Sequence, residues 1–251
     1  MPKPRSHQPK PWVLGLNTAS ETLAIAIAQE DAVRAELYLV PEPGERGHHA
    51  ERLMSGVDAL CRLSGRTPDS LAAVAVAVGP GGFTGVRTSL AAAKTIAQSL
   101  AKPLVGVTTL EALAEQAPIA GLVAPMVDAR RGDVFGGLYR KGPEGLEPVL
   151  APELASATDW VRRVEAASGG ERVAFIGDGA VQNPEPVDGR WPSGTLEPTM
   201  HLLRAASVAR LGAKRLAEGR VDDPLTLLPE YLRAPSAVPN WQPMCPPGET
   251  P

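Results

Sequence analysis

The sequence predicts an α/β fold made of two related halves, each with a mixed sheet flanked by helices. Three observations support this fold class. Short apolar runs near the N-terminus indicate three consecutive strands. Strand and helix patterns then alternate as far as about residue 118, and a weaker succession of strands and helices begins at Leu122. No residue-level repeat links the two halves, so the duplication is inferred from the order of elements.

The first half is predicted to contain five strands and three helices. An apolar stripe with helical spacing indicates the first helix, and Lys102-Pro103 ends the second. Thr108 and Glu111 have the spacing of a capping box that opens the third. A three-strand meander followed by alternation is typical of one half of an actin-like, ribonuclease-H-like fold. The predicted strands are 13–17, 23–29, 33–40, 71–78 and 104–107, and the predicted helices are 49–63, 86–101 and 108–117.

The second half is predicted from fewer signals. A hairpin over 122–128 and 134–140 turns at Arg130-Arg131-Gly132. A helix over 157–167 and a strand over 173–177 follow. A long helix over about 201–218 has Thr199 as its candidate N-cap. We expect a cleft between the two halves.

Composition limits the function classes. The chain has 251 residues, 43% hydrophobic and 21% charged, with a net charge of −3. A protein that binds nucleic acid alone usually has a basic excess, so we expect any RNA contact to come through a partner. Cys61 and Cys245 form neither a disulfide framework nor a zinc motif. No signal-peptide run and no stretch of ~20 apolar residues is present, so we expect a cytoplasmic protein without a membrane segment.

The two ends of the sequence differ from its middle. Residues 1–11 and 234–251 are rich in proline and poor in apolar periodicity, which predicts disordered tails. The predicted organisation is therefore a tail (1–11), a first subdomain that contains a glycine-rich loop (12–118), a second subdomain (119–233) and a Pro-rich tail (234–251).

A glycine-rich segment joins the 71–78 strand to the 86–101 helix. It reads Gly79-Pro80-Gly81-Gly82-Phe83-Thr84-Gly85-Val86-Arg87. A glycine-rich turn before a helix can point backbone N–H groups and the positive helix end at an anion. A tight turn that binds nothing is the alternative. The segment lacks the closing Lys-Ser or Lys-Thr pair of a P-loop.

Arg87 lies in the first predicted turn of its helix. A cation there opposes the helix dipole by roughly 0.3–1 kcal/mol. We therefore expect a partner that offsets this, either a carboxylate, a phosphate or another subunit, and an internal salt bridge is the simplest of these.

The 86–101 helix has two faces that could pack. One face carries Val86, Leu90, Ala93 and Ala97, and the other carries small side chains. A helix with two such faces either buries one of them in a partner or lies between a sheet and a neighbouring helix of the same domain.

Several segments together resemble the TsaB/YeaZ family, the dimerisation subunits of the bacterial complex that makes threonylcarbamoyladenosine in tRNA. The resemblance covers roughly residues 12–233, and the glycine loop and the Tyr-Leu-Arg ending are its most specific parts. The matching segments are Leu14-Gly15-Leu16-Asn17-Thr18-Ala19-Ser20, His49-Ala50-Glu51-Arg52-Leu53, the glycine loop through Arg87, Gly106-Val107-Thr108-Thr109-Leu110, Asp128-Ala129-Arg130-Arg131-Gly132-Asp133-Val134-Phe135 and Pro229-Glu230-Tyr231-Leu232-Arg233.

The resemblance implies a two-subdomain actin-like fold without catalysis by this chain alone. It implies pairing with a catalytic paralogue, TsaD, through a helical bundle made by the 49–63 and 86–101 helices. Arg in place of Leu53 or Leu90 is then expected to abolish association and leave the fold intact. The implied interface residues are His49, Arg52, Leu53, Val57, Leu60, Val86, Arg87, Leu90, Ala93 and Ala97.

The resemblance also implies further partners and ligands. The ATPase TsaE joins the assembly, tRNA binds only through the complex, and a homodimer is possible when the chain is alone. The complex uses ATP and Mg²⁺ to transfer a threonylcarbamoyl group to an adenosine beside the anticodon, and no cofactor is expected on this chain alone. If the glycine loop holds an anion or nucleotide, the candidate residues are Asn17, Thr18, Gly79, Gly81, Gly82, Thr84 and Gly85.

Two sequence features bear on the non-catalytic interpretation. The paralogue's metal site has two histidines one helical turn apart, and no helical His-x-x-x-His occurs here. Asn17 stands where the family usually has an Asp, which removes the charge that Mg²⁺ prefers and favours a simple turn residue. The alternatives are a stand-alone actin-fold ATPase or phosphotransferase that uses the glycine loop, and a protease, for which no nucleophile or metal motif is found.

Overall fold

The computed structural model describes residues 10–20, 22–42, 49–187 and 198–232. Its framework is two mixed sheets of five and four strands, with orders β3-β2-β1-β4-β5 and β8-β7-β6-β9. This confirms the predicted α/β class with two mixed sheets flanked by helices. The strands of the first sheet are β1 (Trp12–Asn17), β2 (Leu23–Gln29), β3 (Ala32–Leu39), β4 (Ala73–Ala77) and β5 (Leu104–Val107), and those of the second are β6 (Gly121–Arg130), β7 (Asp133–Gly142), β8 (Gly145–Ser156) and β9 (Val173–Ile176).

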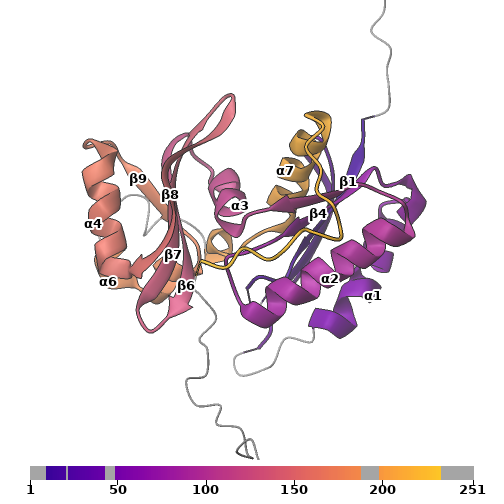
Figure 1. Cartoon of the computed structure of the whole chain (residues 1–251), viewed down its shortest axis with the longest axis horizontal. Coiled ribbons are helices and arrows are strands. Elements are labelled where there is room, and N and C mark those ends of the chain that lie inside the picture. The colour runs from indigo at the N-terminus through magenta and orange to yellow at the C-terminus, as the bar shows by residue number, and fades with distance from the viewer. Residues whose placement is uncertain (1–9, 21, 43–48, 188–197, 233–251) are drawn as a thin grey trace, which may run out of the picture.

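Helices cover both sheets. Figure 1 shows α1 and α2 together on one face of the first sheet, α7 on its other face, α3 between the sheets and α4 on the outer side of the second sheet. The helices and 3-10 turns are α1 (His49–Leu63), η1 (Pro68–Ser70), α2 (Phe83–Ser99), α3 (Thr109–Gln116), α4 (Ala157–Ser168), α5 (Asp178–Gln182), α6 (Pro184–Val187), η2 (Pro198–His201) and α7 (Ala205–Ala217).

The central strands of the first sheet are buried on both faces. Leu14 and Leu16 of β1 belong to the core that includes α1 and α2, whereas Val13 belongs to the core that includes α3 and α7. This explains why β1 and β4 are nearly continuous apolar runs rather than alternating ones. The order of strands and helices through α3 is as predicted, and the Thr108–Glu111 capping box is present.

Helix α7 belongs to the predicted second subdomain by sequence but lies on the first sheet. A Cβ added at Gly15 of β1 would lie 2.4 Å from the carbonyl oxygen of Ala205, and one at Gly212 would lie 2.4 Å from Cβ of Ala75. Only glycines allow this close approach of helix and sheet. The division into 12–118 and 119–233 stays a prediction, and the return of α7 to the first sheet was not part of it.

The second sheet contains the predicted hairpin and one strand that was missed. Strands β6 and β7 pair antiparallel across Arg130–Asp133, in agreement with the prediction. Strand β8 was not predicted, because Pro148 and Pro152 argue against a strand. It lies at the edge of the sheet, where one side of the backbone needs no partner strand, so proline is tolerated there.

Two predicted helix starts are wrong. Helix α2 begins at Phe83 and not at Val86, so the end of the glycine loop is already helical. Helix α7 begins at Ala205 with Arg204 as N-cap, because residues 198–201 form the separate turn η2. Thr199 therefore does not cap it. The short α5 and α6 were not predicted, and the predicted tails lie outside the described residues except for 10 and 11.

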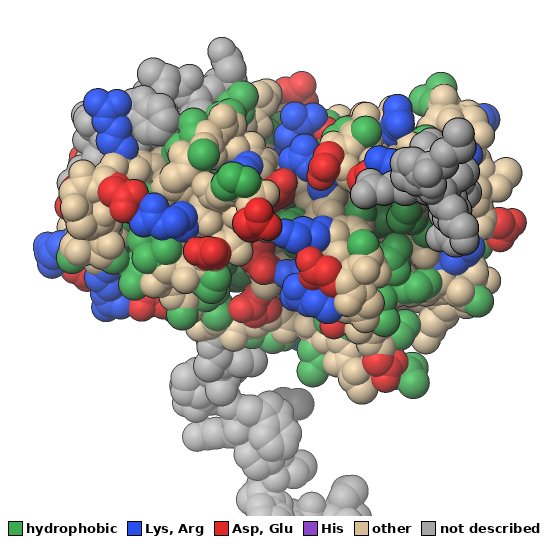
Figure 2. Space-filling view, turned by 90° about the horizontal axis from the view of Figure 1, so that it is seen from above, with side chains coloured by type: hydrophobic (Ala, Val, Ile, Leu, Met, Phe, Trp, Pro, Cys, Tyr) green, Lys and Arg blue, Asp and Glu red, His purple; other side chains and the backbone are tan. Residues whose placement is uncertain are grey.

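In the described part of the chain, no helix is both long and apolar enough to cross a membrane. Figure 2 shows basic and acidic side chains intermixed over the face seen from above, without a broad basic area.

Candidate functional site

The glycine loop is packed against the turn that follows β1. A Cβ at Gly85 would lie 1.8 Å from the carbonyl oxygen of Thr18, and one at Gly81 would lie 2.4 Å from that of Ala19. The Gly82 N–H donates to the Ala19 carbonyl at 2.7 Å, and the Thr18 hydroxyl donates to the Gly85 carbonyl at 2.6 Å. The glycines therefore allow two backbone turns to touch. This geometry favours the tight-turn interpretation over an open anion cradle.

Asn17 holds the end of β1 in place. Its side chain is fully buried, its Nδ2 donates to the Leu203 carbonyl at 3.1 Å, and its Oδ1 accepts from the Ala19 N–H at 2.8 Å. The amide nitrogen and the amide oxygen of Asn17 thus both form hydrogen bonds within the protein. An ionised Asp here could not donate to the Leu203 carbonyl, so Asn17 fits the structural role of a turn residue.

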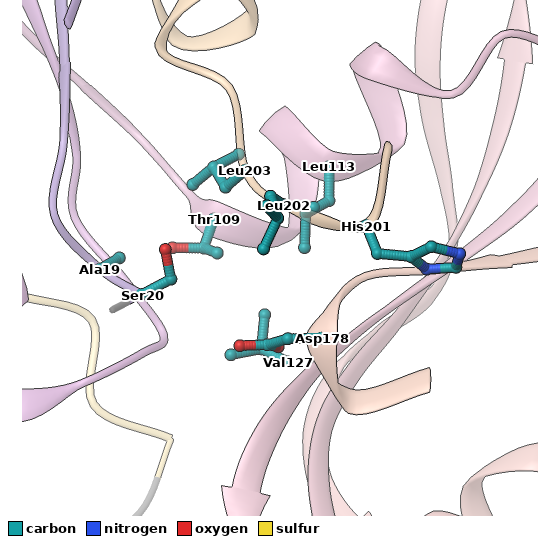
Figure 3. Close-up of a pocket in the computed structure, with 9 residues that line it drawn as sticks. All are labelled: Ala19, Ser20, Thr109, Leu113, Val127, Asp178, His201, Leu202 and Leu203. Atoms are coloured by element: carbon teal, nitrogen blue, oxygen red, sulfur yellow. The ribbon is translucent and has the colours of Figure 1, made fainter. Parts of the chain in front are cut away.

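A small pocket lies between the two sheets, where a cleft was predicted. Figure 3 shows the hydroxyls of Ser20 and Thr109 pointing toward one another, while the His201 ring points away from the centre. The cavity volume is about 10 Å³, which is room for one water and not for a nucleotide. The pocket is lined by Ala19, Ser20, Thr109, Leu113, Val127, Asp178, His201, Leu202 and Leu203.

Of the polar groups that line this pocket, the Asp178 carboxylate has a partner within the second half of the chain. Asp178 Oδ1 accepts from the Asp128 N–H at 2.9 Å, which ties α5 to β6. Burial raises the pKa of the Asp178 carboxyl and lowers the pKa of His201. Among the described residues, no group of three or more His, Cys, Asp or Glu could hold a metal ion.

Arg87 has aromatic partners rather than the expected salt bridge. Its guanidinium lies 3.8 Å from the ring centre of Phe83, and its Nε donates to the Tyr231 hydroxyl at 2.8 Å. No described carboxylate forms an ion pair with it. Because α2 begins at Phe83 and not at Val86, Arg87 lies past the first turn, where the helix dipole opposes a cation little, and the cation–π contact with Phe83 fixes its position. The expectation of an internal salt bridge is therefore wrong within the described residues.

An open groove runs beside Arg87. One wall is α2 and the other is the C-terminal strap, which we define as residues 222–231. The groove has a volume of about 350 Å³. Sequence reasoning missed it because its two walls are far apart in the chain, although Tyr231 belongs to one of the family-like segments. The groove, called the α2 groove below, is lined by Arg87, Leu90, Ala91, Lys94, Leu227, Leu228, Pro229 and Tyr231.

Most of the predicted interface residues are in the core. Seven of them are buried against the first sheet, so no partner can reach them in this conformation. These buried residues, which the resemblance implied as interface, lie on the inward faces of α1 and α2. Arg52 and Arg87 are exposed, and the side chain of His49 lies outside the described part. The buried residues are Leu53, Val57, Leu60, Val86, Leu90, Ala93 and Ala97.

The outward faces of the same helices carry other apolar side chains. Met54 and Leu63 of α1 are 52% and 82% exposed, and Phe83 of α2 is 53% exposed. Large exposed apolar side chains on neighbouring elements are typical of interaction surfaces. Met54 and Leu63 are nine residues apart, about 180° around the helix, so they flank the buried stripe of α1 on opposite sides. The exposed residues Arg52, Met54, Leu63, Phe83 and Arg87 together are called the outer face of α1 and α2 below.

The strap is anchored at both ends to the first sheet. The Asp222 N–H donates to the Leu104 carbonyl at 2.8 Å, and the Glu230 N–H donates to the Val78 carbonyl at 2.7 Å. The Glu230 side chain is half-buried, and its Oε2 has no hydrogen-bond partner among the described residues. Burial raises the pKa of this carboxyl, and the nearby Glu111 carboxylate raises it further.

Replacing Glu230 by Gln is expected to stabilise the protein at neutral pH. Because the folded protein raises the pKa of Glu230 above its ordinary 4.5, ionisation of this group destabilises the fold as the pH rises above that value. Urea unfolding should therefore show a higher free energy of unfolding for Glu230→Gln than for the wild type at pH 7.5, and a smaller difference at pH 4.5. The exposed Glu185→Gln is the matched control. A Glu230→Gln variant less stable than the wild type at pH 7.5 would contradict this account.

Comparisons with known proteins agree with one another. A family model described as TsaD, tRNA N6-adenosine threonylcarbamoyltransferase, matches residues 22–234. The tRNA threonylcarbamoyladenosine biosynthesis protein TsaB of Bacillus subtilis is 33% identical over 91% of this chain and 97% of its own. The TsaB of Escherichia coli is 31% identical over 57% of this chain and 63% of its own. The solved structure of YeaZ from Pseudomonas aeruginosa aligns with a TM-score of 0.75 at 25% identity, over 88% of this chain and all of that one.

Proposed function

The chain belongs to the TsaB/YeaZ family of tRNA threonylcarbamoyladenosine biosynthesis proteins, and we propose that it is the non-catalytic subunit that binds and activates a TsaD-type catalytic paralogue. The complex transfers a threonylcarbamoyl group to an adenosine beside the anticodon. This chain supplies a binding surface, and the paralogue supplies the reacting groups.

The small volume of the pocket between the sheets is the observation that carries the non-catalytic role. At about 10 Å³ it holds no nucleotide. The glycine loop is occupied by the β1–β2 turn, and Asn17 is used within the fold. The alternative is a stand-alone ATPase or phosphotransferase that binds nucleotide at the glycine loop. It would need room for a nucleotide, an open glycine loop and a free polar side chain at position 17, and these three features argue against it.

The outer face of α1 and α2 is the surface that we assign to the partner. It includes the exposed side chains of Met54 and Leu63 on opposite flanks of α1, that of Phe83 on α2, and two arginines. Arginine and aromatic side chains are common at the energetic centre of interfaces. This assignment keeps the predicted helices and replaces the predicted buried residues by those that point outward.

The remaining partners follow from the family. We propose that a TsaE-type ATPase joins the assembly, that ATP and Mg²⁺ are used by the complex, and that tRNA is contacted through it. In the absence of the paralogue the same outer face supports a homodimer. A tRNA-modifying complex of this kind works in the cytoplasm.

Co-purification with the TsaD-type paralogue of the same organism, followed by a tRNA modification assay, tests the proposal. We expect a complex with one copy of each chain, modification that requires both, and no turnover by this chain alone. Failure to form a complex, together with ATP hydrolysis by the isolated chain, would refute the scaffold role and support the phosphotransferase alternative.

A further inference from the structure

The α2 groove has the chemistry of a docking site for an extended segment. Its floor and strap wall are apolar, with Leu90 buried at the bottom and Leu228 71% exposed on the rim. Its α2 side carries the cations Arg87 and Lys94, and neither forms an ion pair with a described carboxylate. An apolar occupant with an acidic residue and no cations fits this surface.

We propose that the occupant is residues 234–251 of this same chain. The strap that forms one wall of the groove leads directly into this segment. The segment has no Lys, Arg or His, and its one acidic residue is Glu249. It offers the apolar side chains of Val238, Trp241 and Met244 for the groove. Its prolines are Pro235, Pro239, Pro243, Pro246, Pro247 and Pro251.

The prolines favour an extended docked form. A Pro-rich segment loses little conformational entropy on binding, and grooves lined by aromatic side chains bind such segments. Tyr231 supplies an aromatic ring to the groove, and Arg87 holds its hydroxyl at 2.8 Å. The ring is thus fixed in position before the segment binds.

The segment is long enough to reach the whole groove. The stretch of α2 from Arg87 to Lys94 is about 10 Å long at 1.5 Å per residue. Eighteen residues extend to roughly 60 Å, so the segment can turn back along the strap. Because it is tethered beside the groove, its effective concentration is on the order of millimolar, and a weak contact is enough to keep it docked. The docked segment would cover part of α2 and limit access to that helix.

Disulfide trapping in the full chain tests the proposal. Cys245 lies in the segment, and Cys61, 2% exposed, is unavailable to it. Ala91→Cys puts a thiol in the groove, and Thr88→Cys puts one on the side of α2 turned about 60° further from the strap. With oxidised glutathione we expect the intramolecular disulfide to form at least about tenfold faster in Ala91→Cys than in Thr88→Cys.

A second variant separates docking from random collision. Leu228→Ser removes apolar surface from the rim, and its exposure means that the fold should tolerate it. We expect it to slow trapping in the Ala91→Cys chain severalfold and to leave the Thr88→Cys rate unchanged. Equal rates in the two cysteine variants overturn the proposal. Disulfides formed only between chains also overturn it, since they place the segment of a second copy in the groove. Neither readout requires the TsaD-type partner.

Discussion

A single methyl group added at Gly85 is expected to unfold the protein or leave it barely stable. The new Cβ would lie 1.8 Å from the carbonyl oxygen of Thr18, a backbone atom that no rotamer change can move. Thr18 is fully buried and bonded to Gly85 through its own hydroxyl, so both turns are fixed. Relief requires that α2 or the β1–β2 turn move away from its packed position. We expect a loss of at least about 3 kcal/mol, a large part of a typical total of 5–15 kcal/mol.

Urea unfolding of Gly85→Ala against Gly142→Ala isolates this effect. Gly142 ends β7, has no positive φ, and a Cβ there meets no atom within 4 Å. The control should therefore remain within about 0.5 kcal/mol of the wild type. A Gly85→Ala protein as stable as its control would show that the loop stands clear of the Thr18 turn, and would reopen the case for an anion site there.

Arg at Leu53 is expected to abolish folding, whereas Arg at the next residue is expected to abolish partner binding. Leu53 is 1% exposed and lies in the core beneath α1, and Met54 is 52% exposed on its outer face. An unpaired buried cation should remove at least about 4 kcal/mol of stability. The resemblance led to a different expectation, that Arg variants of Leu53 and Leu90 lose association but keep the fold, and the burial of both side chains argues against it. The apolar stripe that predicted α1 packs in the core of this protein and is therefore not available to a partner.

Met54→Arg should keep the wild-type melting temperature within about 2 °C and bind the TsaD-type paralogue at least about tenfold more weakly. Thermal melts and calorimetric titration with the paralogue measure the two effects separately. The Asp58→Asn variant, on the exposed side of the same helix, controls for a general change of charge. Wild-type affinity in Met54→Arg would remove α1 from the proposed interface, and unfolding of that variant would contradict its outward placement.

The sequence predicted those parts of the fold that depend on local patterns. The bounds of α1, β2 and β5 agree to the residue, because the spacing and extent of their apolar residues mark them directly. Strand β8 was hidden by its prolines, which are tolerated only because that strand lies at the sheet edge. Edge position is a property of the assembled sheet and leaves no local signal.

The candidate site was harder to predict because its partners are distant in the chain. Arg87 meets Tyr231 across 144 residues, and Asn17 meets Leu203 across 186. The glycine loop drew attention as a possible anion site, yet its glycines are explained by contact with the backbone of Thr18 and Ala19. From the sequence alone, a glycine that leaves room for a ligand cannot be distinguished from a glycine that leaves room for another segment of the backbone.

The return of α7 to the first sheet sets a condition on how the protein is made. Strands β1 and β4 leave the ribosome early, but α7, which packs on the face that includes Val13 and Ala75, follows only after the whole second sheet has been synthesised. Until residues 205–217 emerge, that apolar face stays in contact with water or with a chaperone. A fragment that ends at residue 118 would keep it uncovered permanently. The nascent N-terminal half therefore depends on α7 to complete its core.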